Sequence, residues 1–166
     1  MDNHYRVGGY VKLAKLWDRS REAALAFHKE YYRKKFSQSE DMRLIDVYID
    51  ITGNKEIRKR PEMLRLIRDC KKGNVNCIAT QTRAYLAANN EEFFYLIHLL
   101  LELDPPIEII TEDDDYIFNT IWNPDHQREV MKQTASEYVQ MNPEGYRVWE
   151  NAILRAIGEK QEQNNT

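Results

Sequence analysis

Cysteine is scarce in this chain of 166 residues, which contains only Cys70 and Cys77. One falls on an expected helix and the other on the strand after it, where cysteines usually pack as small apolar side chains. We therefore expect neither a disulfide nor a metal site built on cysteine. No cofactor and no metal are expected for the chain, and a reducing, cytoplasmic setting is the default expectation.

Long apolar runs are also lacking. The longest, around residues 93–101, is interrupted by His98 and is shorter than a transmembrane helix requires. The first residues show no charged segment followed by an apolar one, so no signal peptide is expected. With only 6 Gly and 5 Pro, the composition is that of an ordinary globular protein. These features favour one domain with its own core and no membrane partner.

Charge is divided unevenly along the chain. Residues 1–72 carry 18 Lys and Arg against 11 Asp and Glu, a net charge of +7. Residues 73–166 carry 6 against 16, a net charge of −10, so the whole chain has −3. Such asymmetry indicates either a basic face for a polyanion or solvated helix faces alone. The overall acidity argues against strong nucleic-acid binding by the whole domain.

The pattern of apolar residues predicts strands that alternate with helices. Strands are expected at 5–13, 44–50, 75–80 and 107–111, and helices at 19–36, 61–72, 90–103, 125–141 and 145–157. The first helix is expected to bury Ala23, Ala24, Phe27, Tyr31 and Phe36, and residues 81–89 are interpreted as a loop or irregular turn. This order predicts an α/β fold with a mostly parallel sheet of four to five strands, flanked by helices and followed by one or two C-terminal helices.

The expected elements divide the chain into three parts. Residues 1–122 are predicted to form the α/β domain, and residues 161–166 a disordered tail. The helices within 123–160 are expected to pack on the domain or to form a dimer interface. Between these parts, Asp113–Asp115 is an acidic surface turn, which would hold a divalent cation only if further oxygen ligands converged on it.

Candidate functional residues follow from the position of the strand ends. In an open parallel sheet, ligands bind beyond the carboxyl ends of the strands. The chain has no generic motif for nucleotide binding, metal binding or hydrolysis. The expected strand ends carry basic and hydroxyl side chains instead, which suit an anion such as phosphate. These are Tyr10, Lys12, Thr52, Arg60 and Arg83.

The segment from about Tyr10 to Glu112 resembles the N-terminal catalytic domain of serine recombinases, which are resolvases, invertases and transposon integrases. The likeness rests on a strand tyrosine before a basic helix, on VYID before a Thr-Gly turn, and on KRP before the next helix. It is strongest in DVYIDITGNKEIRKRPEMLRLIRDCKKGNVNCI. The resemblance implies a resolvase-like fold, action on DNA without a metal, and a serine nucleophile assisted by a cluster of arginines.

The same resemblance implies that most of the catalytic set is missing. The family's strand tyrosine is kept as Tyr10, but its strand arginine is replaced by Lys12 and its nucleophilic serine by Ala14. Thr52 and Arg60 keep two further family positions. The D-R-L-x-R motif falls on residues 84–88, where both arginines are lost, to Tyr85 and Ala88.

Magnitudes decide what these replacements mean for catalysis. Removing a covalent nucleophile costs on the order of a millionfold in rate, and each lost charge-stabilising donor costs roughly 100- to 1,000-fold. We therefore predict that no catalytic residue set is intact. Another hydroxyl could replace the nucleophile, and among Ser20, Thr52, Thr80 and Thr82 the best placed is Thr52.

Three functions stay open at this point. The leading one is a catalytically inactive, recombinase-like accessory of a mobile element, which binds DNA weakly and pairs with itself or with a related recombinase. The second is an active phosphoryl-transfer or strand-exchange enzyme with a rearranged nucleophile. The third is an unrelated α/β interaction module that shares only the fold.

Overall fold

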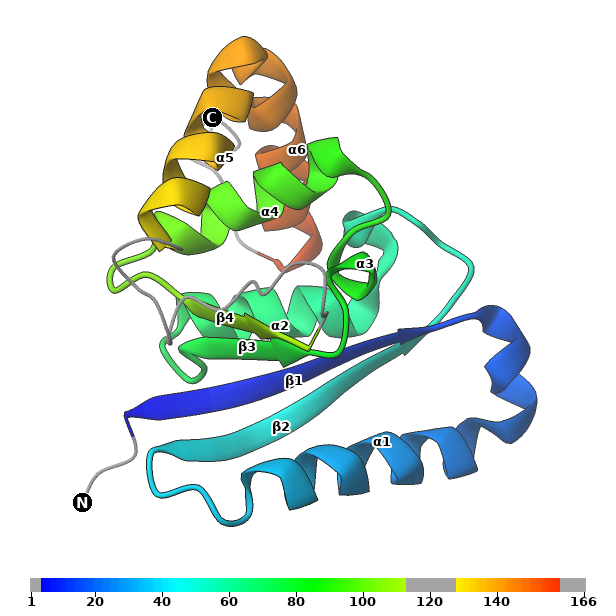
Figure 1. Ribbon diagram of the computed structural model, residues 1–166. Helices are drawn as coiled ribbons and strands as arrows, with labels where there is room; N and C mark the ends of the chain where they lie inside the picture. Colours follow the sequence, from blue (N-terminus) through cyan, green and yellow to red (C-terminus); the bar gives the residue numbers. More distant parts are fainter. Residues whose placement is uncertain (1–3, 113–127, 159–166) are drawn as a thin grey trace.

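The computed structural model describes residues 4–112 and 128–158. Four strands form one fully parallel sheet with the order β2-β1-β3-β4 (Figure 1). They are β1 (Tyr5–Leu13), β2 (Met42–Ile51), β3 (Cys77–Thr80) and β4 (Glu108–Thr111). Helices connect them, so the expected α/β fold with a parallel sheet and flanking helices is confirmed. The acidic turn Asp113–Asp115 and the tail 161–166 lie outside the described residues.

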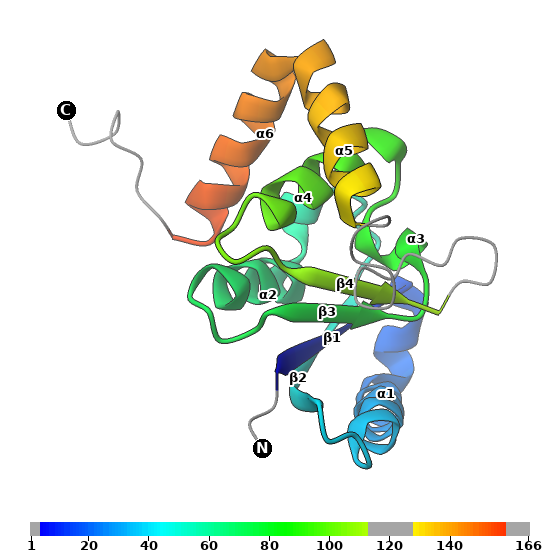
Figure 2. The same cartoon turned by 60° about the vertical axis from the view of Figure 1, so that its left-hand side comes forward.

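The helices lie on both faces of the sheet, as the two views of Figures 1 and 2 show. One face is covered by α1 (Arg21–Phe36), which packs on Val7 and Val11. The other face is covered by α2 (Pro61–Lys71) and α4 (Asn90–Leu101), with α3 (Arg83–Leu86) at its edge. Apolar residues with a period of two along β1 and β2 therefore serve two separate cores.

Two C-terminal helices, α5 (Glu129–Met141) and α6 (Pro143–Ala156), pack against α4 on the side away from the sheet (Figure 2). The contact is aromatic, with the Phe94 and Tyr138 ring centroids 5.0 Å apart and those of Tyr95 and Trp149 5.7 Å apart. The Trp149 indole also donates a hydrogen bond of 2.8 Å to Glu92. None of the described helices combines the length and apolarity needed to cross a membrane.

The expected buried face of the first helix is wrong in part. Its buried side chains are Ala24, Tyr32 and Phe36, whereas Phe27 is 64% exposed and Ala23 is exposed. The buried residues repeat every four positions and include the half-buried His28. Because histidine is polar, the pattern of apolar residues in the sequence does not indicate this face. The Tyr32 ring lies against the backbone of β1 at Gly9, so closely that a Cβ atom on residue 9 would meet the ring at 3.0 Å.

Two further boundaries differ from the expectation. The segment Lys15–Ser20 forms the 3₁₀ helix η1, so the first helix begins at Arg21. The region 81–89 contains the short helix α3, whose start is capped by the Thr82 hydroxyl. Such one-turn elements have too few residues for a readable period. Cys70 and Cys77 are both buried free thiols, as expected.

Candidate functional site

The expected site lies where the parallel strands reach their carboxyl ends. Tyr10 stands opposite Tyr48 on β2 and Thr80 on β3, and Lys12 stands opposite Asp50. Alternate residues of a strand share one face of a sheet. Tyr10 belongs to the core on the α2 side, so Lys12 points to that side too. The carboxyl end of β1 therefore places both Tyr10 and Lys12 beside α2.

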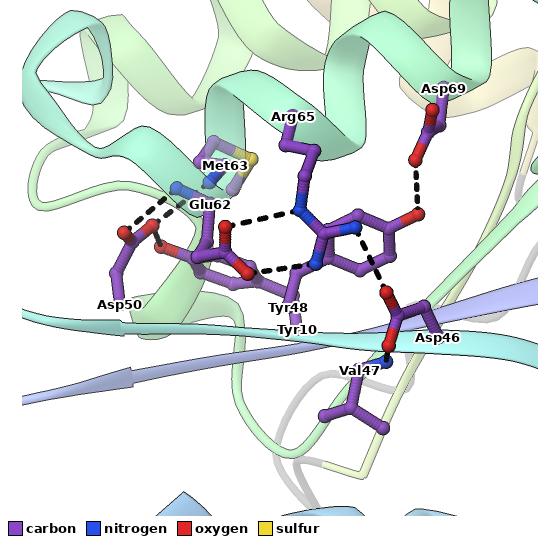
Figure 3. A network of polar contacts seen from close by, with 9 residues as sticks. All are labelled: Tyr10, Asp46, Val47, Tyr48, Asp50, Glu62, Met63, Arg65 and Asp69. Atoms are coloured by element: carbon purple, nitrogen blue, oxygen red, sulfur yellow. Dashed lines mark hydrogen bonds and ion pairs between the residues drawn. The ribbon is translucent and has the colours of Figure 1, made fainter. Parts of the chain in front are cut away.

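A buried carboxylate organises this edge of the sheet (Figure 3). The Tyr10 hydroxyl donates to Asp50 Oδ2 at 2.9 Å. The same carboxylate accepts the backbone N–H groups of Glu62 and Met63, both at 2.9 Å. These are free donors at the start of α2, whose N-cap residue Arg60 makes no side-chain cap bond. Asp50 thus caps α2 from the neighbouring strand.

Burial, and then the adjacent Asp50 charge, raises the pKa of Tyr10 far above its usual value. The hydroxyl therefore stays protonated and acts as a fixed donor to Asp50. It is not available as a phenolate nucleophile or as a base. Tyr10 was expected to contact phosphate, but in this structure its hydroxyl is bonded to the protein.

Asp50 was not among the residues expected at the site, although a sequence signal for it exists. An aspartate at the end of an apolar strand needs donors if it is buried. The next helix begins with Pro61 and has no Ser, Thr, Asp or Asn immediately before it. A helix start without a local cap and a strand carboxylate without a partner can satisfy each other.

A second group of polar contacts attaches α2 to β2 next to this carboxylate (Figure 3). Arg65 binds Asp46 at 2.9 Å and Glu62 at 2.8 Å, and its guanidinium lies 4.1 Å from the centroid of the Tyr48 ring. The Tyr48 hydroxyl donates to Asp69 at 2.5 Å. Since two carboxylates neutralise Arg65, we assign this arginine to packing and not to ligand binding.

Arg60 is almost wholly buried, with 1% of its surface exposed. Its Nη1 donates to the carbonyls of Tyr85 at 2.8 Å and Leu86 at 3.3 Å, and its Nη2 donates to the carbonyl of Lys55 at 3.0 Å. The two carbonyls of α3 belong to residues 84–88, the segment where the family resemblance would place the D-R-L-x-R motif. Arg60 therefore ties the loop after β2 to α3 through its two terminal nitrogens, whereas its buried Nε has no partner among the described residues.

Lys12 lies close to two other cations. Burial lowers the pKa of Lys12, and the positive charges of Arg60 and Lys55 lower it further. Lys55 is exposed, and neither lysine has an ion pair or a side-chain hydrogen bond within residues 4–112 and 128–158. Three cations thus gather at the carboxyl edge without a carboxylate to neutralise the two lysines.

Thr52 has other contacts than this cluster of cations. Its backbone N–H continues the pairing with β1 by donating to Leu13 at 3.0 Å, and its hydroxyl accepts the N–H of Asn54 at 3.0 Å. It lines a hollow of about 560 Å³ along the outer edge of β2, and neither Lys12 nor Arg60 lines that hollow. The sequence predicts Thr52, Lys12 and Arg60 in one site, and of these three Thr52 alone lines this hollow.

The positions where the resemblance implies missing catalytic side chains differ in exposure. Ala14 is exposed directly after β1, and Ala88 is exposed after α3. Tyr85 is half-buried and contacts the cores on both sides of the sheet. Arg83, which was expected to bind phosphate, lies 4.4 Å above the Phe93 ring on α4. The structure therefore places Arg83 beside α4, and its stacked guanidinium helps to hold α3 there.

Metal ligation has no support in the described part of the chain, where no group of three or more His, Cys, Asp and Glu is placed to hold an ion. The acidic turn 113–115 falls outside those residues. The chemistry that remains at this edge is cationic, from Lys12 and Lys55, with the buried Arg60 behind them.

Comparison with known proteins gives a likeness in structure but not in sequence. Neither a family model nor a curated protein sequence matches the chain. The N-terminal catalytic domain of TP901-1 integrase is similar in structure, with a TM-score of 0.59 and 15% identity over 84% of this chain and 97% of that one. The C-terminal catalytic domain of ISC1926 TnpA, an IS607-like serine recombinase, has a TM-score of 0.50 and 16% identity over 93% of this chain and 99% of that one. Similarity at this identity concerns the fold, and the chain has the fold of the serine recombinase catalytic domain.

Proposed function

We propose that the chain is a catalytically inactive, recombinase-like domain that binds the DNA backbone at the carboxyl edge of its sheet. The observation that carries this proposal is the pair Lys12 and Lys55, beside buried Arg60 and without a carboxylate partner in the described residues. Burial lowers the pKa of Lys12 most, and a phosphodiester placed there would offset the repulsion from Arg60 and Lys55 that lowers it further. Contacts to phosphate position a protein on DNA without reading its sequence.

The proposal that the domain does not cut DNA is supported by side chains near the same edge. Ala14 offers no hydroxyl, and Arg60 is buried with both terminal nitrogens bonded to backbone carbonyls. The Tyr10 hydroxyl is held by Asp50. Thr52 is the best placed of the hydroxyls considered as a nucleophile, and it lines the hollow along β2, which neither Lys12 nor Lys55 lines.

We further propose that the domain works as an accessory of a mobile element and pairs with a second copy or with a related recombinase. The C-terminal helices supply apolar surface for pairing, since Val130 on α5, Met141 at its end and Val148 on α6 are all strongly exposed. Light scattering on Val148→Glu would test this part. A dimer that becomes a monomer supports pairing through α6, and an unchanged mass contradicts it.

Binding of DNA can be tested by fluorescence anisotropy with a labelled duplex over a range of salt concentrations. Lys12→Gln with Lys55→Gln should weaken binding and reduce the slope of log K against log salt by about 1.8, which is roughly 0.9 for each lost phosphate contact. Lys72→Gln is the matched control, because Lys72 is an exposed lysine at the other end of α2. No binding at low salt, or an equal loss in the control, would contradict the proposed site.

The inactivity needs a separate experiment. The protein is incubated with nicked DNA substrates that trap a covalent intermediate, and the products are separated on a denaturing gel. We expect no protein–DNA adduct. An adduct that disappears in Thr52→Ala would overturn the proposal in favour of an active enzyme with a relocated nucleophile.

A further inference from the structure

The 3₁₀ helix η1, Lys15–Ser20, leaves two large apolar side chains in solvent. Leu16 is 71% exposed and Trp17 is 48% exposed, and no residue of η1 is buried. In Figure 1 the chain enters this blue turn from the arrowhead of β1, at the carboxyl edge of the sheet. We call Lys15–Ser20 the Trp17 turn. An adjacent leucine and tryptophan that are this exposed indicate a surface that a partner covers.

The Trp17 turn is attached firmly to the candidate site. The backbone N–H of Trp17 donates to the carbonyl of Ala14 at 2.9 Å. Trp17 therefore lies one turn after Ala14, the position where the family resemblance implies a serine. At its other end, Asp18 forms an ion pair of 3.0 Å with Arg21, the first residue of α1. These contacts hold the backbone of the Trp17 turn between the end of β1 and the start of α1.

Charge around the Trp17 turn identifies the kind of partner. Residues 12–21 contain Lys12, Lys15, Arg19 and Arg21 against Asp18 alone, and the ion pair of Asp18 is with Arg21. The three other cations make no ion pair with any described residue. A net positive charge beside an exposed aromatic ring favours a polyanion that also carries flat apolar groups, which describes a nucleic acid.

The exposed ring narrows the expected partner from nucleic acids in general to unpaired nucleotides. In a duplex, the faces of the bases are stacked on one another and a protruding indole cannot reach them. In a single strand each base can stack on an aromatic side chain, and one such contact is worth about 1–3 kcal/mol. Lysines and arginines beside the ring would hold the phosphates on either side of the stacked base.

We propose that the Trp17 turn is a stacking platform for an unpaired base, with the adjoining phosphates held by Lys12, Lys15 and Arg19. The inference deepens the proposed function and rests on it, because it needs nucleic acid at the same edge. It assigns a preference for single-stranded or locally opened DNA, and it gives Trp17 a binding role that the lysines alone do not imply.

The test compares a labelled 20-nucleotide oligo(dT) with a labelled hairpin duplex of equal charge by anisotropy. Trp17→Ala should weaken binding of the single strand by roughly 5- to 150-fold and leave duplex binding unchanged. Its salt slope should match that of the unchanged protein, because no charged contact is lost. Phe27→Ala is the matched control, since Phe27 is an aromatic residue on α1, away from the strand end, that is 64% exposed against 48% for Trp17. Oligo(dT) should quench the tryptophan fluorescence, and the quenching should disappear in Trp17→Ala.

Each contrary result has a distinct meaning. An equal loss on both DNAs, or none on oligo(dT), overturns the stacking platform and leaves backbone binding in place. No binding of either DNA by the unchanged protein at low salt overturns both proposals. If Trp17→Ala abolishes binding to phosphatidylserine vesicles, or turns a dimer into a monomer, while oligo(dT) affinity is unchanged, the turn serves a membrane or a second copy instead.

Discussion

The Tyr10 hydroxyl and Asp50 meet at 2.9 Å across the parallel strands β1 and β2. Because the same carboxylate accepts two backbone N–H groups of α2, this one contact joins three elements. Lys12 and Ala14 follow Tyr10 on the same side of β1, so the buried contact lies directly beneath the proposed DNA-binding edge. Substitutions at Tyr10 should therefore affect stability, and substitutions at Lys12 should affect DNA binding.

Replacing Tyr10 with phenylalanine should lower the free energy of unfolding by about 1.5–3 kcal/mol, the range for a hydrogen bond to a charged group. The hydroxyl is lost while the ring remains, so the buried carboxylate loses one of its three donors. Urea denaturation would measure the change. Tyr31→Phe is the control, since its hydroxyl bonds Glu112 at the surface and its loss should matter less. Equal losses in the two variants would contradict the special role of the Tyr10 contact.

Arg60→Met should destabilise the fold by about 3 kcal/mol or more, because two carbonyls of α3 and one of the loop after β2 lose their donors. Arg60→Lys should recover only part of that loss, since an ammonium group cannot reproduce the planar fork. Thermal melts of both variants would show the order of stability. If both melted like the unchanged protein and only DNA binding fell, Arg60 would be a ligand of phosphate and not a structural residue.

The sequence predicts local features of this fold better than contacts between distant positions. Strand β1 lies where its alternating residues placed it, at Tyr5–Leu13. The sequence predicts Arg60 near the strand ends, but nothing local indicates that its guanidinium turns inward to α3, 25 residues later. The partnership of Asp50 with Tyr10 spans 40 residues in the same way. Such contacts depend on how strands and helices stack, and a single sequence carries no record of that stacking.

The misread face of α1 has a different cause. Its buried row contains His28, and its most exposed aromatic residue is Phe27, so hydrophobicity alone points to the wrong side. The sheet beneath offers a glycine at position 9, which accepts the flat ring of Tyr32. Fit between a ring and an open backbone decides the orientation here, and residue types on the helix do not reveal it.

Lys12→Met should raise stability at pH 7 by less than about 1 kcal/mol, the scale of interactions between exposed charges, while it weakens DNA binding. The pKa of Lys12 is lowered in the fold by burial and by Arg60 and Lys55, so its charged form opposes folding. Below the folded-state pKa this penalty is fully present, and it disappears as pH rises towards the unfolded value of about 10.4. The advantage of the variant in thermal melts should therefore shrink above pH 9.

Lys72→Met provides the control for this prediction, because Lys72 is exposed and ends α2 away from the cation cluster. It should change neither stability nor binding to the same extent. A Lys12→Met protein that is less stable at pH 7, or one that is more stable and binds DNA normally, would remove the reason for placing phosphate beside Lys12.

Restoring the hydroxyl alone should not restore strand cleavage. Ala14→Ser is expected to fold normally, since residue 14 is exposed, and to give no adduct with nicked DNA on a denaturing gel. The serine would still lack the arginines that Tyr85 and Ala88 replace, each worth roughly 100- to 1,000-fold. Ala14→Ser with Ala88→Arg tests whether one exposed arginine begins to recover the reaction, and unchanged duplex affinity would show that both variants still bind. An adduct from Ala14→Ser alone would mean that Lys12 and the buried Arg60 suffice to activate a serine, and the missing hydroxyl would then be the single lesion in an otherwise working site.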